Sequence, residues 1–194
     1  MVVVDRGTGR VYDFWQIERA GSSRWRASWG TWTALSGAGV GGEVGGADGG
    51  STGAGVNLLA GLVRVSDVKK GAIDHALALV SDKSCPGDFR YPATKTDGHA
   101  SEPTCTPEGA RVQLDPSIDV DSLPDIDPAE RAVAKALQTY GGYLRDSGGA
   151  SLGIAFEMPT ADDPYAGAGL PWDYYNMPHI PWDRLRVLSS WNGS

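Results

Sequence analysis

The amino-acid sequence predicts a mainly β protein, an antiparallel β-sandwich of jelly-roll-like order with one α-helix at about residues 128–140. The composition supports this class, because 27 Gly, 12 Pro and 7 Trp with only 21% charged residues suit short strands joined by turns. Several short runs alternate apolar and polar residues, and only one segment has a clear helical period. The alternative is an α+β fold with the helix packed on an antiparallel sheet. The length predicts a single domain over residues 1–194.

The helix is predicted from signals at both of its ends. Asp127 is a suitable N-cap, Pro128 fits the first helical position, and Glu130 completes a capping-box pattern. Gly141 ends the helix. A single apolar stripe predicts a single partner surface, most simply a sheet. The stripe consists of Ala129, Val133, Ala136, Leu137 and Tyr140.

Alternation and turn residues predict the strands and loops. A Ser-Gly-Gly turn predicts that residues 143–146 and 150–157 pair as a hairpin. Residues 36–56 are rich in Gly, Ala and Ser and predict a flexible loop, whereas residues 158–182 predict an ordered aromatic and Pro-rich loop. Further strands are expected at residues 2–5, 10–19, 24–29, 58–65, 72–80, 109–114 and 184–191, with one helical turn at residues 66–71.

The two cysteines, Cys85 and Cys105, predict one disulfide bond across a loop rich in Pro, Gly, Thr and Ser. Disulfides persist in oxidising compartments, so this bond would indicate a secreted, extracellular protein. Two unrelated free thiols are the alternative. Neither cysteine has a Cys-x-x-Cys companion and the His residues are scattered, so no metal and no other cofactor are expected. No run approaches the roughly 20 apolar residues of a membrane span.

Charge and aromatic content indicate the class of partner. A net charge of −7 argues against nucleic acid and against an anionic membrane surface, since both attract an excess of Lys and Arg. Trp and Tyr rings suit stacking on sugars, so a poly- or oligosaccharide is the expected partner, and a homo-oligomer is left open. Alternation places Trp25 and Trp29 on one packed face, which favours a core role for both. The candidate ligand-binding residues are Trp29, Trp172, Tyr174, Tyr175 and Trp182.

Catalysis on a glycan would need acid and base groups in a cleft. A glycoside hydrolase needs two carboxyl groups, about 5 Å apart for retention or about 6.5–9.5 Å apart for inversion. A polysaccharide lyase would use His or Tyr as the base, with Arg or Gln neutralising a uronate. His75 lies on an otherwise apolar strand face, so a hydrogen-bonded core histidine is its alternative role. The catalytic candidates are His75, Gln16, Asp146 and Glu157, with Arg90 and Tyr143 as further lyase residues.

Six short segments spread over nearly the whole chain form a further pattern. They are Asp13-Phe-Trp15, Ala27-Ser-Trp-Gly30, Ile73-Asp-His-Ala-Leu77, Thr96-Asp-Gly98, Glu108-Gly-Ala-Arg111 and Tyr140-Gly...Asp146. In these segments the chain resembles a group of secreted actinobacterial proteins of largely unassigned function. The resemblance implies an extracellular setting and a β-rich fold, and it transfers no activity and no catalytic residue.

The sequence therefore predicts an extracellular carbohydrate-interacting protein, with a polysaccharide lyase or glycoside hydrolase as the first hypothesis. The alternative is a non-catalytic glycan-binding or attachment module, or a structural subunit of an extracellular or virion assembly. An enzyme predicts a cleft in which an acid and a base meet, whereas a module predicts exposed aromatic surfaces without such a pair.

Overall fold

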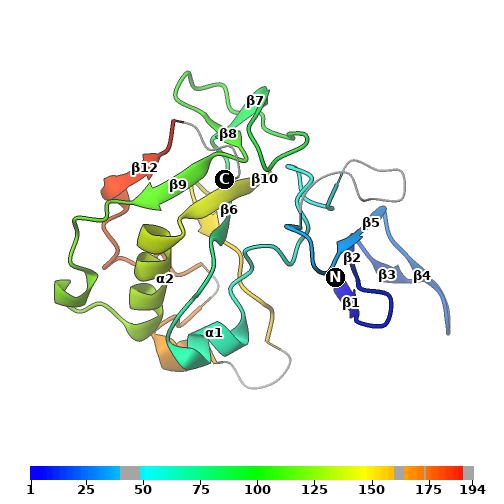
Figure 1. Ribbon diagram of the computed structural model, residues 1–194, viewed down its shortest axis with the longest axis horizontal. Helices are drawn as coiled ribbons and strands as arrows, with labels where there is room; N and C mark the ends of the chain where they lie inside the picture. Colours follow the sequence, from blue (N-terminus) through cyan, green and yellow to red (C-terminus); the bar gives the residue numbers. More distant parts are fainter. Residues whose placement is uncertain (40–48, 160–163, 173, 190–194) are drawn as a thin grey trace.

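The computed structural model describes residues 1–39, 49–159, 164–172 and 174–189 of the chain (Figure 1). These residues form a mainly β fold with one long helix, as predicted. Their strands form a three-stranded, a five-stranded and two two-stranded sheets. A closed sandwich or jelly roll is not seen among these strands. Within the same ranges, no helix is both long and apolar enough to cross a bilayer.

Residues near the N-terminus form the three-stranded antiparallel sheet. Strand β2 (Arg10–Trp15) lies between β1 (Val2–Asp5) and β5 (Trp29–Ala34). The short strands β3 (Glu18–Arg19) and β4 (Trp25–Arg26) form a separate pair. The predicted first hairpin is therefore present, but its second strand stops before Gln16, whose φ of +48° does not fit an extended strand. Figure 1 shows this N-terminal sheet beside the rest of the molecule.

The five-stranded sheet carries the main hydrophobic core, and its strand order is β11-β6-β10-β9-β12. The strands are β6 (Leu77–Ser81), β9 (Arg111–Leu114), β10 (Gly142–Ser147), β11 (Gly153–Ile154) and β12 (Leu185–Val187). Strand β10 runs parallel to β6, and β11 pairs with the other edge of β6. The predicted hairpin of residues 143–146 and 150–157 is therefore wrong. Strand β6 can lie between them because Leu77, Ala78 and Leu79 are buried on both of its faces, as a central strand requires.

Helix α2 (Pro128–Thr139) forms where it was predicted and packs against β9. Val133 and Leu137 join the core of the five-stranded sheet. At the start of the helix, the backbone N–H of Asp127 donates to Oε2 of the fully buried Glu130 at 3.0 Å. The same carboxylate lies 2.6 Å from Nδ1 of His179, and this hydrogen bond raises the pKa of His179. A helix lying on a sheet is the feature that the α+β alternative predicted.

Several predicted strands are shorter or absent. Instead of the strand predicted at residues 58–65, residues 58–61 form turns, and Val63 pairs with Phe156 in an isolated parallel bridge. Helix α1 (Val65–Lys70) follows, close to the predicted helical turn, and the strand predicted at residues 72–80 begins only at Leu77. A parallel strand pair that was not predicted lies at the two ends of the disulfide loop, β7 (Ser84–Phe89) and β8 (Thr106–Glu108). Short 3-10 helices occur at η1 (Val120–Ser122), η2 (Ala166–Ala168) and η3 (Trp182–Arg184).

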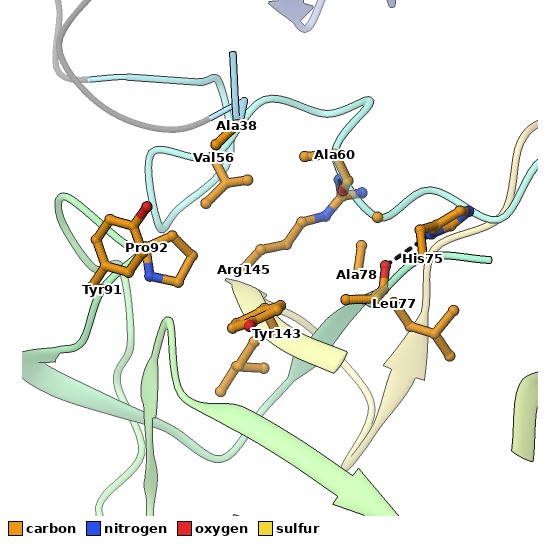
Figure 2. Close-up of a pocket in the computed structure, with 13 residues that line it drawn as sticks. Ala38, Val56, Ala60, His75, Leu77, Ala78, Tyr91, Pro92, Tyr143 and Arg145 are labelled. Carbon is orange, nitrogen blue, oxygen red and sulfur yellow. Dashed lines mark hydrogen bonds between the residues drawn. The ribbon is translucent and has the colours of Figure 1, made fainter. Parts of the chain in front are cut away.

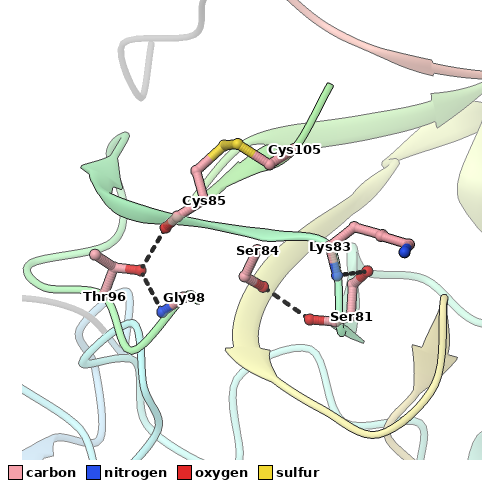
Figure 3. The surroundings of a disulfide bond; sticks show 7 residues. All are labelled: Ser81, Lys83, Ser84, Cys85, Thr96, Gly98 and Cys105. Carbon is pink, nitrogen blue, oxygen red and sulfur yellow. Dashed lines mark hydrogen bonds between the residues drawn. A yellow bond between two sulfur atoms is a disulfide. The ribbon is translucent and has the colours of Figure 1, made fainter. Parts of the chain in front are cut away.

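The predicted disulfide between Cys85 and Cys105 is present, with the two Cα atoms 5.0 Å apart (Figure 3). Inside the loop that it closes, the Thr96 hydroxyl donates to the Cys85 carbonyl oxygen at 3.4 Å. The backbone N–H of Gly98 donates to the same hydroxyl at 3.0 Å. The loop therefore folds back onto β7. The disulfide is compatible with an extracellular location.

The Gly-rich segment predicted as a flexible loop, residues 36–56, is described only in part, because residues 40–48 lie outside the described ranges. After them, the chain packs between the N-terminal sheet and β10. Oδ2 of the fully buried Asp13 accepts from the backbone N and hydroxyl of Ser51 at 2.8 and 2.9 Å. The backbone N–H of Ala54 donates to a carbonyl of β10 at 2.9 Å. This part of the segment is thus a packed connector and not a loose loop.

The aromatic and Pro-rich segment, residues 158–182, also departs from a surface loop where it is described. Residues 160–163 and 173 lie outside the described ranges. Apolar side chains of this segment are buried in the core of the five-stranded sheet, which ties the segment to the domain. These buried residues are Leu170, Met177 and Ile180.

Candidate functional site

A pocket of about 290 Å³ lies between β6, β10 and the segments around Ala60 and Pro92 (Figure 2). The pocket walls are mostly apolar, and Val56 is one of the residues that line them. The volume is near the lower end of the range for small-molecule sites. Four polar side chains line it, namely His75, Tyr91, Tyr143 and Arg145.

A β-bulge in β10 places Arg145 in the pocket wall. The register between β10 and β6 shifts between Leu144 and Asp146, which leaves Arg145 as the extra residue. The Arg145 residue is only 6% exposed, and Nη1 donates to the backbone oxygens of Leu58 at 2.8 Å and Ala60 at 3.1 Å. Its Nε is buried without a hydrogen-bond partner among the described residues. Burial lowers the pKa of Arg145, and the guanidinium holds the neighbouring turn over the pocket.

His75 lies at one end of the pocket, just before β6 (Figure 2). Its Nδ1 is 2.9 Å from the carbonyl oxygen of Ala76, and its Nε2 is 3.3 Å from Oδ2 of Asp67 on α1. Both neighbouring atoms are acceptors, so the ring can donate to both only as an imidazolium. In the neutral form one nitrogen keeps a lone pair, which is what a general base needs.

A second group of titratable side chains, the carboxylate cluster, consists of Asp97, Glu108 and Asp146. One carboxylate oxygen of each residue lies within 4.8 Å of the others. Asp97 is exposed, Asp146 is half-buried and Glu108 is fully buried. Burial, and after it the neighbouring Asp97, raises the pKa of Glu108 to about 8, and burial also raises the pKa of Asp146. A pKa of about 8 means that Glu108 keeps its proton at neutral pH, which lessens the repulsion that ionised acids this close would exert on one another.

Two of the predicted catalytic residues lie outside both the pocket wall and the carboxylate cluster. Gln16 is exposed at the end of β2. Glu157 accepts from Nε of Arg64 at 3.0 Å at the start of α1, and this hydrogen-bonded ion pair lowers the pKa of Glu157. The other two predicted residues, His75 and Asp146, belong to the pocket and to the carboxylate cluster respectively. Among the described residues, no hydrogen bond or ion pair joins any two of these four.

The N-terminal sheet exposes a pair of indole rings, the Trp15–Trp29 pair. The two residues are direct cross-strand partners on β2 and β5, so their side chains project from the same face. They are 53% and 38% exposed, and Nζ of Lys95 lies 5.2 Å from the centre of the Trp29 ring. Trp25 is exposed as well. The prediction that Trp25 and Trp29 fill a sandwich core is therefore wrong.

The four other predicted ligand-binding aromatics divide into two kinds. Trp172 and Tyr174 are exposed, with ring centroids 6.1 Å apart. Tyr175 and Trp182 instead pack against the core, and Nε1 of Trp182 donates to the backbone oxygen of Met177 at 3.0 Å. Only Trp172 and Tyr174 therefore present most of their ring surface to a ligand.

The sequence alone does not single out Trp15, Glu108 or Arg145 as functional residues. The partnership of Trp15 with Trp29 depends on the pairing of two strands, which the sequence does not give. Asp97 lies in the loop between the two cysteines, and no short spacing in the sequence links it to Glu108. The one available signal was that Asp97, Glu108 and Asp146 all fall in segments of the resemblance pattern.

Comparisons with known proteins found no matching family model, no similar curated protein and no similar solved structure. The resemblance to secreted actinobacterial proteins stays a prediction.

Proposed function

We propose that the protein is an extracellular glycan-binding module. The exposed Trp15–Trp29 pair is the observation that supports this function. Exposing two large apolar rings to water on one face of a sheet costs free energy. Exposed apolar patches commonly mark interaction sites. The flat face of an indole matches the apolar face of a sugar ring, and its N–H leaves a polar edge for hydroxyl groups.

The surroundings of the pair fit a neutral or acidic sugar. Lys95, which reaches Trp29 from the disulfide loop, supplies an ammonium donor beside the stacking surface. Trp25 is exposed on the adjacent β3–β4 pair, with the guanidinium of Arg19 6.0 Å from its ring centre. A chain with a net charge of −7 lacks the excess of basic residues that nucleic-acid backbones require, so stacking on nucleotide bases is the weaker explanation.

Alanine at Trp15 or at Trp29 is expected to weaken glycan binding at least about tenfold, because each change removes about 1.4 kcal/mol or more of ring contact. The measurement is retention by affinity electrophoresis in gels that contain xylan, β-glucan, glycol chitin or alginate. Trp172→Ala is the comparison, since it removes an indole that is at least as exposed from the separate segment of residues 158–182. Thermal stability should change little in all three variants, because the rings are exposed.

Equal retention of all three variants would contradict this assignment of the binding surface. Loss of binding in Trp172→Ala alone would show that Trp172 and Tyr174 form the glycan-binding surface instead. If none of these polysaccharides retards the wild-type protein, the result would contradict binding to the glycans of this panel.

A polysaccharide lyase is the second candidate, because the pocket brings His75 and Tyr143 together with a buried guanidinium. In such a reaction a base removes the proton at C5 of a uronate, and the electron pair forms a C4–C5 double bond as the C4–O bond breaks. The departing oxygen takes up a proton, and His75 and Tyr143 would supply the acid and base groups. A cation near the uronate carboxylate would stabilise the negative charge that develops there.

Incubation with alginate, pectate and hyaluronan tests this candidate through the ultraviolet absorbance of unsaturated products. If the pocket is catalytic, His75→Ala and Tyr143→Phe should each lower the rate at least about 100-fold, the usual range for loss of a general acid or base. Tyr140→Phe, an exposed tyrosine at the end of α2, is the control. Absence of unsaturated products from all three polymers would exclude them as lyase substrates and leave the binding module.

A further inference from the structure

The carboxylate cluster brings three acids from different elements to one point. Asp97 comes from the loop closed by the disulfide, Glu108 ends β8, and Asp146 lies on β10. One oxygen of each lies within 4.8 Å of the others. Across the described ranges, none of the ion pairs involves any of these three residues. The negative charge of the cluster therefore has no Lys, Arg or His in ion-pair contact.

Glu108 provides a second, independent observation. Its side chain is fully buried, and neither of its carboxylate oxygens has a hydrogen-bond partner among the described residues. Buried carboxylates are normally hydrogen-bonded, paired with a cation or bound to a metal, because an isolated buried charge is very costly. An oxygen of Glu108 instead approaches those of Asp97 and Asp146.

Backbone groups hold the other two carboxylates in place. The N–H of Gly53 donates to Oδ1 of Asp146 at 3.0 Å, and the N–H of Ser147 donates to Oδ1 of Asp97 at 3.1 Å. A Cβ on Gly53 would lie 2.2 Å from Oδ1 of Asp97, so the packed connector passes directly beside the cluster. These contacts fix the acids before any ligand arrives.

We propose that Asp97, Glu108 and Asp146 form a binding site for a divalent cation, with Ca²⁺ as the expected ion. All three candidate ligands are carboxylates, which hard cations such as Ca²⁺ and Mg²⁺ prefer, whereas Zn²⁺ favours thiolate and imidazole. Ca²⁺ also accepts irregular coordination by groups from different segments. The ion would neutralise the cluster and join β8, β10 and the disulfide loop. No metal was predicted from the Cys and His spacing, because these three carboxylates are separated in the sequence and meet only in the fold.

The test is isothermal titration calorimetry of the full chain with CaCl₂, after treatment with EDTA and dialysis. Saturable binding to one site is expected, together with a rise of several degrees in Tm at millimolar Ca²⁺. Asp97→Asn, which changes an exposed ligand and so leaves the fold intact, should weaken binding at least about tenfold. Asp88→Asn, at an exposed carboxylate on β7, is the matched control and should bind like the wild type.

A second variant, at Glu108, tests the cation site independently of Asp97→Asn. Glu108→Gln removes one carboxyl ligand at nearly constant volume, so it should abolish the Ca²⁺-dependent rise in Tm without unfolding the metal-free protein. No saturable heat and equal Tm values in EDTA and Ca²⁺ would overturn the proposal. Equal affinities of Asp97→Asn and Asp88→Asn, or a rise of wild-type size in Glu108→Gln, would overturn it too.

Discussion

Replacing Gly109 with alanine is expected to lower the free energy of unfolding by about 4 kcal/mol, a large share of a typical domain's stability. Gly109 has a φ of +80°, where a side chain costs about 1–2 kcal/mol. A Cβ there would also lie 1.7 Å from the carbonyl oxygen of Arg90 and 2.9 Å from the backbone N of Ala93. Both of these close atoms belong to the backbone. To relieve the overlap, the end of β8 would have to move away from the turn at residues 90–93.

Gly149→Ala is the matched control. Gly149 has open space where a Cβ would be placed, and its φ lies outside the left-handed region, so the change should alter stability by less than about 0.5 kcal/mol. Urea denaturation followed by tryptophan fluorescence measures both variants. Equal unfolding midpoints for Gly109→Ala and Gly149→Ala would contradict this prediction, because they would show that the turn at residues 90–93 can shift without lowering the free energy of unfolding.

Removing the disulfide by the double change Cys85→Ala and Cys105→Ala is expected to lower stability by about 3 kcal/mol, from the entropy of the loop it closes. The bond joins two residues that lie 20 positions apart in the sequence. The effect should appear as a lower urea midpoint at unchanged secondary structure by circular dichroism.

A reducing agent supplies the control for this prediction. Dithiothreitol should lower the midpoint of the wild-type protein towards that of the double variant, and it should leave the double variant unchanged. A wild-type midpoint that is the same with and without reductant, after confirmed reduction of the bond, would mean that β7 and β8 hold the loop without it.

The disulfide loop contributes to each of the candidate sites. Pro92 lines the pocket, Lys95 approaches Trp29, and Asp97 belongs to the carboxylate cluster. The hydrogen bonds from Thr96 to Cys85 and from Gly98 to Thr96 anchor this part of the loop on β7. The covalent link therefore positions functional candidates as well as stabilising the fold.

Local chemistry determined the elements that the sequence predicted correctly. Helix α2 follows from an N-cap aspartate, a proline at its first position and a glycine after its end, all of which act within one or two turns. The first hairpin follows from alternation and a glycine turn. Two cysteines in an otherwise turn-rich loop have one pairing available to them, which is why the disulfide was predictable.

The tertiary structure alone decided the sheet order and the candidate sites. A period of two marks residues 143–146 and 150–157 as extended, but it cannot show that β6 enters between them, because that depends on which strand is buried on both faces. Trp25 and Trp29 were predicted as core because alternation identifies a face without identifying what covers it. Asp97, Glu108 and Asp146 meet only after β7, β8 and β10 have packed, since their proximity arises from contacts between segments that are distant in the sequence.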